Sequence, residues 1–224
     1  MITFSTNFEK FKNALKAVLG ASNSKMQGST LYYVAFKLFN DKIELAATDG
    51  NRIRLKRLEL DARLPEVTGP IKVLIDGGIL LNQIKNFKVE KTSQHLVSMF
   101  FEYDDENKKI SCQCPQIMLQ KTNIITADLN YPQYEQLIKN YNNVNMNFIN
   151  EMRQGDADTL KVSFTVGYLM DYLKNLDKKS HVLFEIKHNL GGVNVYSSED
   201  AALFELLMPV QWKNIIAKQQ YNGD

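Results

Sequence analysis

A short stretch of the sequence concentrates positive charge immediately after a tight turn. Residues 46–58 read AATDGNRIRLKRL, in which an apolar segment ends at a Thr-Asp-Gly turn over residues 48–50. The segment that leaves the turn carries four basic residues: Arg52, Arg54, Lys56 and Arg57. Glycine permits backbone angles in such turns that other residues rarely adopt. These residues leave three interpretations open: an ordinary hairpin, a phosphate-binding loop, or one wall of a binding site.

The cysteine and histidine content argues against a metal site. Cys112 and Cys114 are the only cysteines, and their spacing places them on one face of any strand. The three histidines, His95, His181 and His188, lack the spacing of metal ligands. We therefore expect no metal and no cofactor. Two cysteines at this spacing cannot cross-link a fold, which indicates a reducing, cytoplasmic compartment.

No set of residues has the spacing that catalysis requires. The sequence contains no Gly-x-Gly-x-x-Gly, no Walker loop and no Ser-His-Asp set with nucleophile-elbow spacing. Gly77 and Gly78 open a predicted helix, where anions bind in other proteins, but the adjacent carboxylate of Asp76 opposes an anion. The acidic pair Asp104 and Asp105 lies in a predicted turn, which is typical of solvated surface. We therefore expect a protein that is not an enzyme and that works through its surfaces.

Composition is that of a soluble globular protein. Of 224 residues, 44% are hydrophobic and 23% are charged, which suits one large or two small domains. Residues 1–127 contain 18 Lys and Arg against 13 Asp and Glu, whereas residues 128–224 contain 9 against 12. This asymmetry points weakly to a polyanionic partner, and scatter is the favoured explanation of the numbers alone. Charged residues interrupt the first helix-like stretch, and no apolar run is long enough for a signal peptide or a membrane span.

Hydrophobic periodicity predicts an α+β fold built from one repeated unit. Residues 1–127 read as a strand, a helix and three strands, followed by the same order again. The helices are predicted at residues 7–20 and 76–88, with Asn7 or Thr6 capping the first and Asp76 capping the second. The strands are predicted at residues 1–5, 31–39, 42–48, 52–60, 70–75, 96–104, 109–114 and 117–125.

The same unit is predicted a third time after a polar interruption. Residues 128–140 form a linker with a short helical end, and the stretch that follows is rich in asparagine. A strand at 159–164 and a helix at 165–176 come next. Three further strands are predicted at 181–188, 193–197 and 202–210, with a turn at Leu190-Gly191-Gly192.

Three segments resemble the bacterial DNA polymerase III β sliding clamp family. ATDGNRIRL, residues 47–55, resembles that family's Ala-Thr-Asp-Gly-His-Arg-Leu signature. NYPQYEQLI, residues 130–138, resembles its Phe-Pro-x-Tyr linker between the second and third domains. FTVGYLMDYLKNL at 164–176, with LFELLMPVQW at 203–212, resembles its terminal helix and Met-Pro ending. The three segments occur in the family's order, and the resemblance implies a DNA-clamp fold built from repeated strand-helix-three-strand units.

The resemblance also implies a groove that binds partner peptides, with the Thr-Asp-Gly turn as one wall. Carried over by position, its lining would be Leu31, Thr48, Gly50, Arg52, Ile53, Pro132, Leu137, Tyr168, Leu190, Leu206, Leu207, Met208 and Pro209. A peptide side chain that is fully buried there would gain roughly 1.5–3 kcal/mol. The competing interpretation is that these residues only form the hydrophobic core that joins two domains.

Members of the family encircle duplex DNA with lysine-bearing helices, so the resemblance implies contacts to phosphates that do not read sequence. The residues that would face DNA are Lys10, Lys12, Lys16, Lys25, Lys85 and Lys88. Implied partners are duplex DNA, a DNA polymerase, other peptides that bind clamps, a clamp loader, and further copies of the chain in a trimeric or tetrameric ring. The alternatives are a solvated helix face and a clamp-like adaptor that binds peptides without encircling DNA.

Departures from the family pattern set the predicted domain boundaries. Residues 1–127 would be a clamp domain of two units, and 128–159 a linker with a polar insert. Residues 160–211 would be a second clamp domain or half domain, and 212–224 a C-terminal tail. The signature histidine is replaced by Asn51, and Asp76-Gly77-Gly78 stands where the family usually has basic residues. The predicted strands at 1–5 and 117–125 would leave unpaired edges in a monomer, which favours an oligomer.

Overall fold

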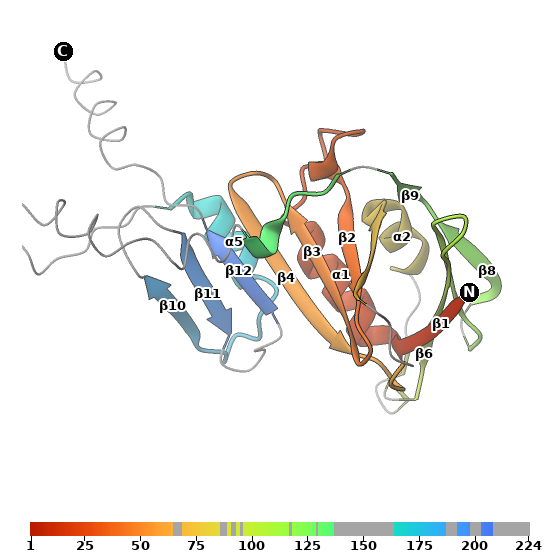
Figure 1. Cartoon of the computed structure of the whole chain (residues 1–224). Coiled ribbons are helices and arrows are strands. Elements are labelled where there is room, and N and C mark those ends of the chain that lie inside the picture. Colours follow the sequence, from red (N-terminus) through yellow and green to blue (C-terminus); the bar gives the residue numbers. More distant parts are fainter. Residues whose placement is uncertain are drawn as a thin grey trace, which may run out of the picture. The chain divides into compact units, whose positions relative to one another are not determined.

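A computed structural model of the chain describes residues 1–64, 69–85, 89–90, 93–94, 96–116, 118–128, 130–136, 164–186, 192–197 and 203–207 (Figure 1). Its helices are α1 (Phe8–Leu19), α2 (Gly77–Ile84), α5 (Val166–Leu173) and the 3-10 helix η1 (Thr30–Tyr32). The first four strands are β1 (Ile2–Asn7), β2 (Val34–Leu38), β3 (Lys42–Thr48) and β4 (Arg52–Glu59). The next five are β5 (Ile71–Ile75), β6 (Ser98–Asp104), β7 (Lys109–Cys114), β8 (Met118–Ile124) and β9 (Thr126–Ala127). The last three are β10 (Val182–Ile186), β11 (Val193–Ser197) and β12 (Leu203–Leu207).

The chain forms two compact units. The first contains residues 1–50 and 54–132, and the second contains residues 51–53 and 133–224. The short segment Asn51–Ile53, which includes the start of β4, therefore clusters with the second unit. The boundary near Pro132 falls inside the linker predicted at 128–159. Among the described helices, none is long and apolar enough to cross a membrane.

Two strand-helix-three-strand repeats make up the first unit, as predicted. The first repeat is β1-α1-β2-β3-β4 and the second is β5-α2-β6-β7-β8. The strands lie in the orders β1-β6-β7-β8 and β4-β3-β2-β5-β9. β1 pairs antiparallel with β6 of the second repeat, and β5 pairs antiparallel with β2 of the first. The two repeats thus exchange their first strands, and β1 and β8 are the end strands of one sheet.

The helix α1 forms because apolar residues recur at helical spacing. Phe8, Phe11, Leu15 and Val18 are all fully buried, which confirms the face predicted for them. The side chain of Asn7 accepts a hydrogen bond from the Lys10 N–H at 3.0 Å and caps the helix N-terminus. The aromatic ring of Phe11 lies edge-on to Phe101 of β6, at 5.0 Å between ring centroids. The same ring lies edge-on to Phe36 of β2 at 5.8 Å, so the helix joins both sheets of the unit into one core.

The contact between α1 and α2 depends on a glycine. Gly77, the first residue of α2, is buried, and a Cβ placed on it would lie 2.7 Å from Val34 Cγ2. The same Cβ would lie 3.1 Å from Leu19 Cδ2 and 3.2 Å from Leu15 Cδ1 of α1. Gly78 has no such neighbour, since its Cβ would first meet Asp76 Oδ1 at 3.5 Å. Gly77 thus serves close packing between the two helices.

We expect Gly77→Ala to lower the free energy of unfolding by about 1–3 kcal/mol, because Val34 and α1 would have to move. Gly78→Ala is the matched control in the same helix turn. It should be neutral or raise stability by up to about 1 kcal/mol, because alanine loses less backbone entropy than glycine. Urea denaturation followed by circular dichroism measures both changes. Equal effects at the two positions would contradict the packing role of Gly77.

Several element boundaries differ from the sequence prediction. The strand predicted at 31–39 begins only at Val34, because Thr30–Tyr32 form a 3-10 helix in which the Ser29 side chain accepts from the Leu31 N–H at 3.3 Å. The helix predicted at 76–88 ends at Ile84. Asp76 does cap it, since its carboxylate accepts from the Ile79 N–H at 2.9 Å. The predicted Asp104 turn is confirmed, and its hydrogen bond from the Asn107 side chain lowers the pKa of Asp104.

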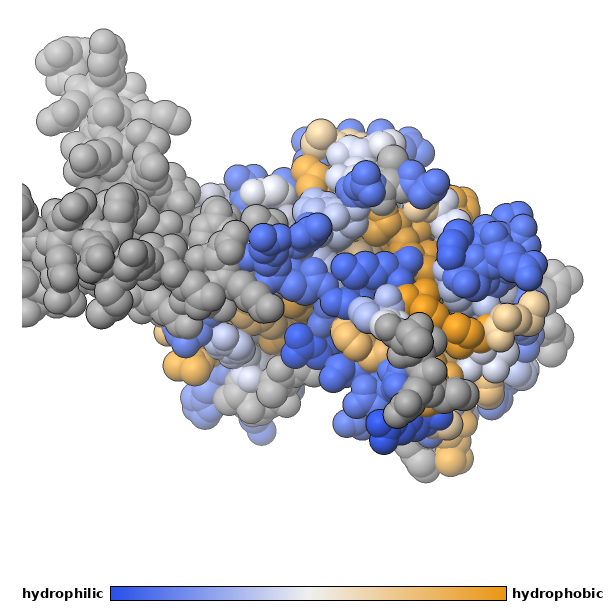
Figure 2. All heavy atoms as spheres, viewed as in Figure 1, coloured by the Kyte–Doolittle hydropathy of each residue, from blue (hydrophilic) through white to orange (hydrophobic). Residues whose placement is uncertain are grey.

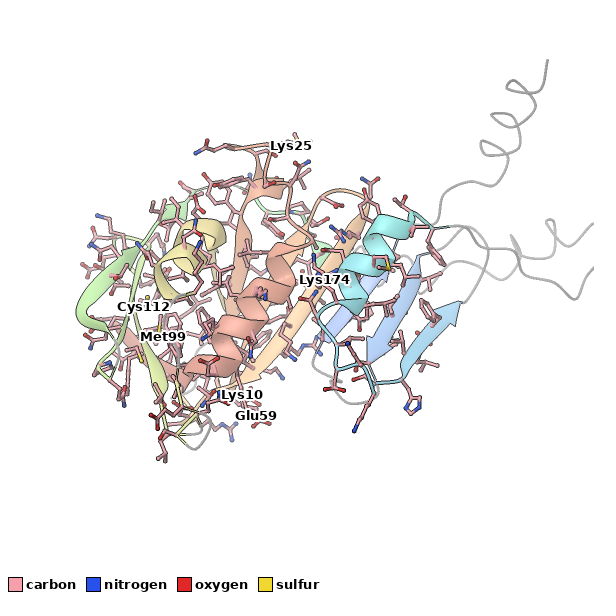
Figure 3. All side chains as sticks on the ribbon, turned by 180° about the vertical axis from the view of Figure 1, so that it is seen from behind. Lys10, Lys25, Glu59, Met99, Cys112 and Lys174 are labelled. Carbon is pink, nitrogen blue, oxygen red and sulfur yellow. The ribbon has the colours of Figure 1, made fainter. Side chains whose placement is uncertain are left out.

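The described part of the second unit contains one helix and three strands. β10, β11 and β12 pair antiparallel in that order. The helix α5 lies across one face of these strands (Figure 3). Tyr172 holds it there: the side chain is fully buried, and its hydroxyl donates to the Val195 carbonyl at 3.4 Å. Residues 159–163 of the strand predicted at 159–164 lie outside the described residues, and Phe164 is not in a strand.

Candidate functional site

In the first unit, η1 meets the Thr-Asp-Gly turn. The Thr48 hydroxyl accepts a hydrogen bond from the Gly50 N–H at 3.1 Å, and Gly50 has a φ of +92°. That angle favours glycine, so a side chain at this position would strain the turn. Leu31, from η1, lies beside the turn, with its Cδ1 4.0 Å from the position of a Cβ on Gly50. The structure therefore brings Leu31, Thr48 and Gly50 together, although they come from different elements.

The start of the linker also packs on this turn. The Tyr131 hydroxyl donates to the Ala46 carbonyl of β3 at 3.3 Å, and burial raises the pKa of Tyr131 well above its usual range. Pro132 follows it and is half-buried. Sequence reasoning named Pro132 and missed Tyr131. The sequence feature that could have identified Tyr131 is its position as an aromatic residue directly before the proline of the linker.

In the second unit, Arg52 is the centre of a buried charged cluster. Only 8% of its side chain is exposed, and its Nη1 donates to Asp171 Oδ2 of α5 at 3.0 Å. Glu205 Oε1 of β12, which is fully buried, lies 3.8 Å from the same nitrogen. The guanidinium carbon lies 4.5 Å from the centroid of the Tyr168 ring. Arg52 thus joins the start of β4 to α5 and β12 within the second unit, and its guanidinium lies over the ring of the half-buried Tyr168.

Asp171 and Glu205 are functional candidates that sequence reasoning missed. Asp171 also pairs with Lys174 one turn later in α5, and that lysine is largely exposed. An acid inside an otherwise apolar strand, as in LFELL at 203–207, was the signal for a buried partner of a distant arginine. Charged residues are seldom fully buried without such a partner.

Leu206 and Leu207, predicted to line the groove, are both buried. Both are at most 1% exposed. A Cβ placed on Gly192 would lie 2.2 Å from Leu206 Cδ1, so that leucine fills the space left by a glycine. Ile53 is also buried, with 6% exposed. The remaining predicted lining residues, Leu137, Leu190, Met208 and Pro209, lie outside the described residues.

The described lysines that were predicted to face DNA lie on α1, in the segment that follows α1, and directly after α2. Lys10 and Lys16 are exposed on α1, whereas Lys12 pairs with Glu9 at 2.6 Å and lies over the Phe8 ring. Figure 3 shows Lys10 and Lys25 far apart, toward opposite ends of the first unit. Lys85 is exposed and donates to the Asn82 side chain at 2.9 Å. Lys88 lies outside the described residues.

The cysteine pair has the chemistry of core residues. Cys112 and Cys114 are both buried on β7 and are not joined in a disulfide. Burial raises the pKa of the Cys112 thiol to about 12, so it stays protonated at neutral pH. Within the described residues, no group of three His, Cys, Asp or Glu side chains is arranged to hold a metal ion.

No protein-family model matches the sequence, and no curated protein matches it either. Solved structures do match, and they define the class of protein whose architecture this chain shares: its fold is that of a DNA sliding clamp. More particularly, it is the fold of the bacterial DNA polymerase III β clamp.

Three of these structures illustrate the likeness. The Bacillus subtilis DNA polymerase sliding clamp matches with a TM-score of 0.69 at 15% identity, over 94% of this chain and 64% of that one. The Thermotoga maritima DNA polymerase III β subunit gives 0.68 at 14%, over 94% and 66%. The Pseudomonas aeruginosa sliding clamp bound to griselimycin gives 0.70 at 12%, over 94% and 65%. The chain thus spans slightly less than two thirds of the length of each.

Proposed function

We propose that this chain acts as a sliding clamp, a processivity factor that encircles duplex DNA as a homo-oligomeric ring of three or four copies and binds peptides of a DNA polymerase and other partners. The observation that carries the proposal is the clamp fold, shared over 94% of the chain with solved clamps. A clamp loader is the expected assembly partner, and the cytoplasm the expected compartment. The proposed role is not enzymatic and uses no cofactor.

Peptide binding is proposed for residues of both units. In the first unit these are Leu31, Thr48 and Gly50 at the turn, and Pro132 at the start of the linker. In the second they are Arg52, Ile53, Leu137, Tyr168, Leu190, Leu206, Leu207, Met208 and Pro209. Of the described members, Leu31 and Tyr168 combine a large side chain with partial exposure, so they are the best anchors for a ligand. A short peptide loses conformational freedom on binding, so we expect micromolar affinity, on the order of −8 kcal/mol.

The test is calorimetry with a short peptide that carries a glutamine and two large apolar side chains. Leu31→Ala and Tyr168→Ala should each weaken binding by about 10- to 100-fold, because each removes apolar contact with the peptide. Leu96→Ala is the matched control, since Leu96 is 66% exposed in the first unit and outside the proposed set. It should leave the affinity unchanged.

The C-terminal tail requires a second comparison, between the full chain and one that ends at Gln211. Tighter binding after truncation would mean that the tail competes with the peptide. If neither form binds while circular dichroism shows both folded, peptide docking is excluded.

The adaptor alternative is supported by the helices themselves. Of the α1 lysines, only Lys10 and Lys16 are exposed, and the exposed face of α5 is apolar, with Val166 73% and Met170 61% exposed. A surface that tracks the phosphate backbone needs several cations on one face. An adaptor would bind the same peptides and leave DNA free.

Retention on circular DNA separates the two functions. If the chain is a ring, Lys10→Glu with Lys16→Glu should shorten retention. The slope of log affinity against log salt should also become shallower by about 0.9 for each phosphate that is no longer neutralised, because fewer counterions are released on binding. Lys109→Glu, on the exposed start of β7, is the control and should change neither. Wild-type protein that never remains on closed circular DNA after loading would favour the adaptor.

A further inference from the structure

The exposed face of α5 carries an apolar stripe. Val166, Met170 and Leu173 recur at helical spacing and are 73%, 61% and 37% exposed. The opposite side of the helix is anchored to its strands by the buried Tyr172. An amphipathic helix normally turns polar residues outward, so an outward apolar stripe indicates a surface that another element covers.

The first unit shows what covers the equivalent helix face in its own strand-helix-three-strand repeats. There, α1 and α2 pack together through Leu15, the eighth residue of α1, and Gly77, the first residue of α2. In α5, the first residue is Val166 and the eighth is Leu173. The two exposed ends of the stripe therefore occupy the positions through which one repeat packs against another.

The strand that follows α5, β10, also has a side that a second repeat would cover. In the first unit, the strands after the helices are β2 and β6, and each is flanked by the first strand of the other repeat. The equivalent strand of the second unit is β10, which stands at the end of its strand order. It carries two exposed apolar side chains, Leu183 at 64% and Phe184 at 39%. Figure 2 shows apolar side chains over β10.

We propose that α5 and β10 form a self-association surface, and that a second copy of this chain occupies it through the same surface. The two α5 helices would run antiparallel about a two-fold axis, so that Val166 of one copy meets Leu173 of the other and the reverse. Met170, midway between them, would lie near the axis. The paired repeats would reproduce the arrangement that the two repeats of the first unit already show.

A second copy fits better than an unrelated partner for two reasons. The proposed contact is self-complementary, because Val166, the first residue of α5, and Leu173, the eighth, are both apolar. The charged residues beside the stripe are Asp171 and Lys174, which pair with each other, so they do not repel a second copy. One departure is expected: Val166 has a side chain where α2 has glycine, so the two α5 helices would be farther apart than α1 and α2. An isologous pair also produces even-numbered assemblies, which favours four copies over three.

The test is a pair of charge substitutions in the full chain, measured by sedimentation velocity. Val166→Glu and Leu173→Lys should each weaken self-association by more than about tenfold, because a charge would be buried against an apolar side chain. Mixing the two variants should restore the wild-type mass. In a mixed dimer, the glutamate at position 166 of one copy meets the lysine at position 173 of the other, and the second contact is again between Val166 and Leu173. Met26→Glu is the control: Met26 is an exposed apolar residue of the first unit, 46% exposed, and its change should have no effect.

Cross-linking provides an independent measurement. Mixed Val166→Cys and Leu173→Cys variants should form a disulfide-linked dimer on oxidation, while Met26→Cys should not. The native Cys112 and Cys114 are buried and should contribute little to cross-linking.

The proposal would be overturned by a monomeric wild type, by single variants that associate as strongly as wild type, or by a mixture that stays dissociated. Association that appears only when the chain is shortened to Gln211 would also overturn it, because the tail would then be the occupant. Peptide affinity, measured in parallel, should not change in these variants, so failure here is distinct from failure of the clamp function.

Discussion

Arg52→Ala should destabilise the second unit by about 3–5 kcal/mol, because it leaves buried carboxylates without their arginine. Glu205 is fully buried, and Asp171 accepts a hydrogen bond from Arg52 at 3.0 Å. The substitution also removes the guanidinium that lies over the Tyr168 ring. Hydrogen exchange of the α5 amides measures the effect in the unit concerned, and urea denaturation measures it in the whole chain.

The matched control uses the same carboxylate. Lys174 also pairs with Asp171, but 65% of its side chain is exposed. Lys174→Ala should therefore change stability by less than about 1 kcal/mol, since solvent screens exposed pairs. Similar losses for Arg52→Ala and Lys174→Ala would mean that burial of the cluster has little energetic consequence.

Arg54→Ala should destabilise the first unit by about 2–5 kcal/mol, because it removes a charged hydrogen bond and leaves a cavity. The Arg54 side chain is fully buried, and its Nη1 donates to the Ala17 carbonyl at 2.7 Å. Ala17 lies in the last turn of α1, where carbonyl groups lack partners within the helix and a cation is favourable. Exchange of the α1 amides should therefore increase, while that of the α5 amides should not.

Two further variants separate volume from charge. Arg54→Met keeps most of the volume and removes the hydrogen bond, so its effect should be smaller than that of Arg54→Ala but still above about 1 kcal/mol. Arg63→Met makes the same chemical change at an exposed position of the first unit, and it should cost less than about 1 kcal/mol. Identical stability of Arg54→Met and wild type would contradict a role for the hydrogen bond to α1.

The buried position of Arg52 also decides how the proposed peptide site can be probed. Arg52 was assigned to peptide binding from the sequence, but its substitution is expected to disturb α5 and Tyr168 as well. Leu206 and Leu207 present the same difficulty, because both are buried in the second unit. Leu31 and Tyr168 are the informative positions, since each is partly exposed and its removal leaves no buried charge.

Local features of the fold were determined by the sequence alone. Helical spacing of Phe8, Phe11, Leu15 and Val18 identified the buried face of α1. Asp76 was predicted as the cap of α2, and Asn7 was one of two caps predicted for α1. The repeated order of strand, helix and three strands was also readable, because each element depends on residues close in sequence. The resemblance of three segments to the clamp family indicated the fold that the solved structures share.

The tertiary structure decided which elements pair and which charges are buried. Strand β1 pairs with β6 rather than with a neighbour in sequence, and this exchange of first strands has no local signal. Sequence spacing also treated the arginines after the turn alike, although β4 buries Arg52 and Arg54 and exposes Arg57. The partner of Arg52 on α5 is 119 residues away, so its burial becomes favourable only when distant segments supply a carboxylate. The sequence therefore located the turn and its charges, and only the folded chain determined that two of them stabilise the interior.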